Sequence, residues 1–123
     1  MKHVLYVGQD PATVDFSDPS LPDDADAAKI QAGIEQAMHA LSARGWNAVR
    51  CMIPPDAAGI DTLTRTLQAE RFDCVVVGGG LRIPSTLRLF EQVINAIHAA
   101  APQARIAFNT TPDDTAAAAA RWI

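Results

Sequence analysis

The sequence predicts one α/β domain of three layers, in which helices cover both faces of a four-stranded parallel sheet. Short apolar runs alternate along the chain with stretches of helical spacing, and this alternation is typical of parallel strands joined by helical crossovers. The 123 residues suit a single domain spanning 1–123. Hydrophobic residues make up 49% of the chain and charged residues 20%, which is ordinary globular composition and sufficient for a core without disulfide or metal support.

Four apolar runs are the predicted strands, and they cover 3–8, 47–53, 73–78 and 104–109. The first and third are continuously apolar, as expected of central strands that are covered on both faces. The second and fourth alternate, so that Cys51 and Ile53 face one way and Met52 the other. Because alternation indicates a partly exposed edge, the predicted strand order is 2-1-3-4, similar to a reduced flavodoxin-like or Rossmann-like sheet.

A helical stretch follows each predicted strand. The first has apolar positions over 30–41 and ends at Gly45, since a glycine after a helix is a stop signal. The second and third have helical spacing over 60–67 and 87–97. The fourth begins at Thr111, an N-cap followed by proline at the first helical position. Right-handed crossovers then predict the first and fourth helices on one face of the sheet and the other two on the opposite face.

The strand order predicts where a ligand binds. The direction of winding reverses between the first and third strands, and open α/β sheets bind ligands beyond the carboxyl ends of the strands at such a point. The loops that follow these two strands are 8–26 and 78–86. The first is long for an α/β connection, and long loops in compact domains are often functional.

Three consecutive glycines, Gly78, Gly79 and Gly80, open the second of these loops. Glycines let a ligand approach backbone N–H groups that form anion-binding nests, and Arg82 adds a cation that grips a carboxylate or phosphate through two bonds. Ser85 precedes the next helix as a further donor or cap. Two interpretations stay open: an anion site, or a tight turn that lets the helix pack closely while Arg82 is merely solvated.

The first loop is rich in aspartate and proline. Asp10 directly follows the strand and is the best candidate for a catalytic acid or base, and Gln9 beside it is a candidate ligand contact. Phe16 and Leu21 are predicted to fold back as a lid. The aspartates lack calcium-loop spacing, so we assign no metal site. We expect those before the first helix to cap it, namely Asp23, Asp24 and Asp26.

Asn109 and Thr110 follow the fourth strand and belong to the same end of the sheet, so they join the predicted ligand-binding residues. The histidines His3, His39 and His98 are expected away from this end, which argues against a histidine-based active site. The sequence names no cofactor and does not decide whether the protein is an enzyme.

The formal net charge of −4 argues against nucleic-acid binding and against an anionic membrane surface. The apolar run at 4–7 is too short for a secretion signal or a membrane span. Cys51 and Cys74 lie inside apolar runs and are predicted to be free, buried thiols of a reducing compartment. We therefore expect a cytoplasmic protein.

The alanine-rich helix near the end of the chain predicts self-association. Small residues over 116–120 permit close helix approach, and Trp122 follows at the helix tip, where an aromatic side chain is seldom left in water. A homodimer is therefore expected, and the alternative is that Trp122 folds back on the first helix of its own chain.

Parts of the chain resemble known families. The parallel sheet with Thr110 after the fourth strand resembles response-regulator receivers, but Gly78 and Gly79 stand where a receiver carries its phosphorylated aspartate, and the fifth strand with its lysine is absent. The run 77–80 resembles the glycine-rich phosphate loop of universal-stress-type proteins, at a different spacing. The whole chain, especially residues 8–19 and 78–90, is similar to a group of small bacterial proteins with no assigned function, a resemblance that implies no activity.

These observations support two hypotheses. The first is binding of a compact anionic ligand, bearing a phosphate or carboxylate, at the crevice between the first and third strands. The alternative is a non-catalytic, receiver-like interaction module whose outer helices bind a protein. A polar cleft between the two loops favours the first hypothesis, whereas a filled crevice and an external apolar patch favour the second.

Overall fold

A computed structural model describes residues 1–123 and contains one four-stranded sheet. The strands are β1 (His3–Gln9), β2 (Asn47–Ile53), β3 (Cys74–Val77) and β4 (Arg105–Phe108). All three strand pairings are parallel, and the order is β2-β1-β3-β4. The predicted sheet order is therefore confirmed, and with it the reversal of winding between β1 and β3.

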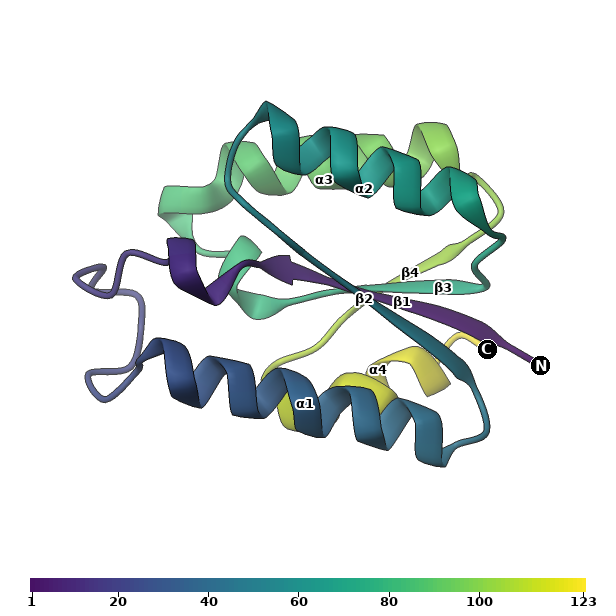
Figure 1. Cartoon of the computed structure of the whole chain (residues 1–123), viewed down its shortest axis with the longest axis horizontal. Coiled ribbons are helices and arrows are strands. Elements are labelled where there is room, and N and C mark those ends of the chain that lie inside the picture. The colour runs from purple at the N-terminus through teal and green to yellow at the C-terminus, as the bar shows by residue number, and fades with distance from the viewer.

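Helices cover both faces of the sheet. They are α1 (Ala27–Ala43), α2 (Ala57–Ala69), α3 (Leu87–Ala100) and the short α4 (Thr115–Ala120). Figure 1 shows α2 and α3 on one face and α1 and α4 on the other, as right-handed crossovers predict. None of these helices combines the length and the apolar character that a bilayer-spanning segment requires.

The helix ends follow from local side-chain and backbone chemistry. The Asp26 carboxylate accepts a hydrogen bond from the Lys29 backbone N–H at 2.8 Å and caps α1. Gly45, just beyond the other end of α1, has a φ of +81°, which glycine adopts without steric cost. Thr111 and Asp114 form a reciprocal capping box ahead of α4. Asp24 does not cap α1, because its carboxylate binds the Lys29 ammonium instead.

Each face of the sheet has its own core. Along β2, Cys51 and Ile53 belong to the core under α2 and α3, whereas Met52 packs against the core under α1 and α4. Both cysteines are free and buried, as predicted. Cys51 and Cys74 belong to different cores and lie on strands that β1 separates, so they are not placed to form a disulfide.

The alanine-rich α4 packs inside its own chain. Ala116, Ala118 and Ala119 are buried in the core that α4 shares with α1. These three small residues therefore let α4 approach the sheet of its own chain closely, and they are not free to pack against a second copy. Trp122 is 53% exposed at the tip of α4, while Ile123 packs against the same core. Self-association stays a prediction that now depends on Trp122.

Candidate functional site

A cavity of about 880 Å³ lies at the carboxyl ends of β1 and β3. Its walls come from the loop after β1, the loop after β3, the start of α1, the end of β2 and the segment that leads into α4. The two loops lie at the same end of the sheet in Figure 1. Seven of the predicted ligand-binding residues line it: Gln9, Gly78, Gly79, Gly80, Arg82, Ser85 and Thr110.

The glycine loop leaves two backbone donors free. Gly78 donates to the Val7 carbonyl at 2.8 Å and so extends the pairing of β1 with β3. In the single 3₁₀ turn that follows (Gly79–Leu81), the Leu81 N–H donates to the Gly78 carbonyl. The N–H groups of Gly79 and Gly80 have no acceptor within the chain. Two adjacent unpaired amides therefore belong to the cavity wall.

Arg82 ties the ends of two strands together. Its guanidinium donates to the carbonyls of Val77 and Asn109 and to the Asn109 side-chain oxygen, and it stacks 5.3 Å from the ring centroid of Phe108. These contacts differ from the interpretation in which Arg82 is merely solvated, and the anion-site interpretation did not foresee them either. The strand ends present carbonyls without ladder partners, and a guanidinium carries enough donors to satisfy several at once.

Arg82 nevertheless has no carboxylate in direct contact with it at the cavity. No carboxylate lies within ion-pair distance of its guanidinium, and the contacts above leave part of its donor set free. Burial lowers the pKa of Arg82, but an arginine stays protonated at neutral pH. A half-buried cation without a carboxylate partner favours an anion beside it.

Asn109 lies behind the cavity wall and does not line it. It is 1% exposed, and its amide nitrogen donates to the Tyr6 hydroxyl at 3.3 Å and to the Thr115 hydroxyl at 3.0 Å. Its oxygen accepts from Arg82. Asn109 therefore positions Arg82 and Tyr6. It directly follows β4 and faces the same side of the sheet as the buried Ala107, two residues earlier, as the two-residue period of a strand requires.

Tyr6 is a cavity residue that the sequence analysis did not identify. It lies in the buried centre of β1, yet its ring and hydroxyl reach the wall beside Gly78. Burial raises the pKa of the Tyr6 hydroxyl, although hydrogen bonding with Asn109 opposes the shift, so the group is neutral at physiological pH. The only sequence signal was a polar atom inside an otherwise apolar strand, which has to find a partner.

Asp10 does not line the cavity. Its carboxylate accepts from the Ala12 N–H at 3.0 Å and begins a 3₁₀ turn (Pro11–Thr13) directly after β1. Gln9 lines the cavity, but its amide donates to the carbonyl of Thr13 at 3.0 Å and so supports the same turn. The residue expected to act as acid or base therefore shapes the loop in this structure.

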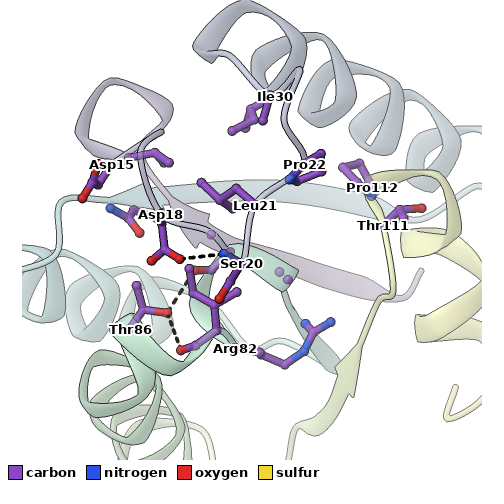
Figure 2. A pocket seen from close by; sticks show the side chains of 18 of the residues that line it. Asp15, Asp18, Ser20, Leu21, Pro22, Ile30, Arg82, Thr86, Thr111 and Pro112 are labelled. Atoms are coloured by element: carbon purple, nitrogen blue, oxygen red, sulfur yellow. Dashed lines mark hydrogen bonds between the residues drawn. The ribbon is translucent and has the colours of Figure 1, made fainter.

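A side-chain contact joins the two loops. The Ser85 hydroxyl donates to the Asp18 carboxylate, so Ser85 connects the loops and does not cap α3. Asp18 also accepts from the Ser20 N–H at 2.9 Å, and Figure 2 shows this contact beside Thr86. Of the two predicted lid residues, Leu21 lines the cavity, while Phe16 is 37% exposed and outside it.

Thr110 reaches the cavity but is engaged with Asp114. Its N–H and hydroxyl donate to that carboxylate at 2.8 and 2.7 Å. Burial raises the pKa of Asp114, but the hydrogen bonds from Thr110 and Thr111 outweigh it and hold the pKa below its ordinary value. Asp114 thus stays ionised and orders the wall, and its charge favours the Arg82 cation from beyond ion-pair distance.

Three aspartates on the long loop also line the cavity. Asp15 binds the N–H and hydroxyl of Ser17, Asp18 is held as described, and Asp24 pairs with Lys29 at 3.1 Å. Hydrogen bonds from these partners lower the pKa of each carboxyl, so all three are charged at neutral pH. The long-loop side of the cavity therefore carries three carboxylates, one of them paired with the Lys29 ammonium, while the unpaired donors lie on the loop after β3.

The remaining chemistry-bearing residues do not gather here. None of the three histidines lines the cavity, and no three His, Cys, Asp or Glu side chains are grouped as they would be around a metal ion. The arrangement is suited to holding a small molecule between backbone amides and a wall of mixed polarity. No protein-family model matches the chain, and a search of curated proteins finds no relative of it.

Proposed function

We propose that this protein binds a small anion, carried as a phosphate or carboxylate group, in the cavity between β1 and β3. The observation that carries the proposal is the pair of N–H groups on Gly79 and Gly80 that have no acceptor in the chain. Adjacent backbone amides without partners are the usual contact for an anionic group, because each unpaired donor gains a charge-assisted hydrogen bond.

The charge of Arg82 supports the same end of the cavity. A Cβ at Gly79 would lie 3.6 Å from an Arg82 terminal nitrogen, so the guanidinium lies close to the backbone that carries the free amides. An anion bound to those amides therefore meets a cation within a few ångströms, in a half-buried setting where solvent screening is weak.

The open crevice favours ligand binding over the alternative function, a module that only binds another protein. A module that acts only through its outer helices needs no opening at the sheet end, whereas this crevice is an open cavity with polar groups from both loops. We assign no reaction to the site, because Asp10, the expected acid or base, serves the loop turn instead.

A pair of variants at Gly79 tests the proposal. Gly79→Pro removes one free N–H without breaking any hydrogen bond of the chain, and Gly78 before it has φ −72° and ψ 157°, a conformation that a following proline accepts. Gly79→Ala keeps the N–H, and its added Cβ makes only ordinary contacts. Both variants should fold like the parent.

Titration calorimetry with inorganic phosphate, phenyl phosphate and phenylacetate then measures binding. Gly79→Pro should weaken the affinity for the anion by roughly ten- to a hundredfold, the value of one hydrogen bond to a charged group, while Gly79→Ala stays within about threefold of the parent. Equal affinities of the proline and alanine variants, or no binding of any anion by the parent, would overturn the proposal.

A further inference from the structure

We infer that the ligand is an organic anion with an apolar alkyl or aryl body, whose body lies against the α1 side of the cavity while its head group meets the glycine loop. The inference rests on the proposed anion site and adds the class of ligand. Three features of the cavity support it: its size, the separation of its polar and apolar walls, and the way the long loop is held in place.

The cavity is much larger than an inorganic anion. Its volume of about 880 Å³ lies near the upper end of the range of roughly 300–1,000 Å³ that is typical of sites for drug-sized ligands. A water molecule takes roughly 30 Å³ of liquid volume, and a phosphate ion is only a few times larger. Such an ion bound at the glycine loop would leave most of the space to water.

Much of that remaining space is bounded by apolar side chains from separate parts of the chain. Leu21 and Pro22 come from the long loop, Ile30 from α1, Met52 from β2 and Pro112 from the segment before α4. Figure 2 shows Ile30, Pro22 and Pro112 together on the α1 side, with Leu21 between them and Arg82. Their convergence builds an apolar wall, which gains free energy when a ligand displaces water from it.

The polar donors lie on the opposite wall. Gly79, Gly80 and Arg82 belong to the loop after β3, and in Figure 2 Arg82 and Thr86 lie on the far side of Leu21 from Ile30. A molecule that satisfies both walls at once therefore has a charged end and an apolar end. A ligand polar throughout would leave the apolar wall in contact with water or with unpaired polar groups.

Leu21 is held over the cavity by contacts within the protein. The Ser85 hydroxyl binds Asp18, three residues before Leu21, and so joins the long loop to the loop after β3. The Leu21 N–H also donates to the Asp18 carbonyl at 3.1 Å. Phe16 belongs to the same loop and is also large and apolar, but it does not line the cavity. The pair Leu21 and Phe16 therefore provides a matched test.

The experiment compares ligands that share a head group and differ in their body. Calorimetry measures inorganic phosphate, ethyl phosphate, butyl phosphate and phenyl phosphate, with acetate, butyrate and phenylacetate as the carboxylate series and phenol as the uncharged control. Affinity should rise roughly fourfold for each methylene that becomes buried, and phenyl phosphate should bind at least tenfold more tightly than phosphate. The better of the two series identifies the head group.

The variants Leu21→Ala and Phe16→Ala then locate the apolar body. Leu21→Ala should reduce the advantage of phenyl phosphate over phosphate roughly fivefold or more and leave phosphate binding unchanged, whereas Phe16→Ala should change neither. If butyl and phenyl phosphate bind no better than phosphate, or if Leu21→Ala leaves the advantage intact, the inference is wrong and the anion site stands. If phenol binds as well as phenyl phosphate, or if no anion binds, the proposed anion site itself fails.

Discussion

The two ends of the sheet use their polar residues in opposite ways. At the amino end, the His3 N–H donates to the Asp73 carboxylate at 2.8 Å, and the His3 ring contacts Asn47 at 3.0 Å and Glu70 at 3.6 Å. The turns there are short, and the ring nitrogen is shared with these neighbours. At the carboxyl end, the loops are long, a cavity is open, and Gly79 and Gly80 carry unpaired amides.

Side chains of the types common in catalysis therefore lie at one end of the sheet, and the groups left free for a ligand lie at the other. His3, Glu70 and Asp73 are of the residue types that usually attract attention as catalysts, yet they close the end of the sheet where strands begin. The groups that remain free for a ligand belong to glycines and to an arginine. Under the proposed function, free donors rather than reactive side chains mark the ligand-binding end of this sheet.

The largest expected effect tests whether Arg82, at the carboxyl end of the sheet, also stabilises the fold. Arg82→Ala removes hydrogen bonds to Val77 and Asn109 and leaves partly buried acceptors behind, so the free energy of unfolding should fall by about 3 kcal/mol. Urea unfolding measures this. Arg88→Ala is the matched control, because Arg88 is exposed and makes no side-chain hydrogen bond or ion pair, and its variant should stay within about 0.5 kcal/mol of the parent. Equal stabilities of the two variants would show that Arg82 serves only the ligand.

The next largest effect tests whether water is excluded from Cys74, the first residue of β3, at the amino end of the sheet. Burial raises the pKa of the Cys74 thiol from 9.0 to about 11, so the folded chain keeps this proton at a pH where the unfolded chain has lost it. The free energy of unfolding is therefore insensitive to this group below about pH 9 and should fall by about 2 kcal/mol as the pH rises from 9 to 11.

Cys74→Ala isolates this contribution. Urea unfolding of the parent and the variant under reducing conditions at several pH values gives the difference between their slopes. The variant should lose less stability between pH 9 and 11, although Cys51, whose pKa burial also raises, gives both proteins a decline in the same direction. Parallel slopes would mean that water reaches Cys74 and that the amino end is not closed.

The sequence predicted what depends on local pattern. Continuous and alternating apolar runs were sufficient for the order of the strands, because each pattern reports whether one or both faces of a strand are covered. Gly45 marked one end of α1, and three neighbouring aspartates marked the other, where Asp26 alone is the cap; such end signals act on the adjacent backbone. The same reasoning found the glycine loop, since the switch point of a sheet follows from its order.

The roles of individual site residues depended on contacts between distant segments. The sequence shows that Arg82 follows the glycines, but its hydrogen bonds to the Val77 and Asn109 carbonyls depend on how β3 and β4 end side by side. The side of the sheet that Asn109 faces was predictable from its two-residue spacing from Ala107. Its partner Tyr6 was not, because Tyr6 lies two strands away. Leu21 and Phe16 looked alike in sequence, and only the path of the loop distinguishes them.

The smallest expected effect tests the amino end of the sheet, which lies opposite the cavity. Asp73→Ala removes the carboxylate that accepts the His3 backbone N–H between the starts of β3 and β1, so it should lower the free energy of unfolding by about 1 kcal/mol. Because this carboxylate lies at the end of the sheet opposite the cavity, the affinity for phenyl phosphate should be unchanged. Gly79→Pro should give the reverse pattern, with weaker binding and unchanged stability. Calorimetry and urea unfolding on both variants make the comparison. A loss of affinity in Asp73→Ala would mean that the two ends of the sheet are coupled, and that the division between a structural and a functional end does not hold.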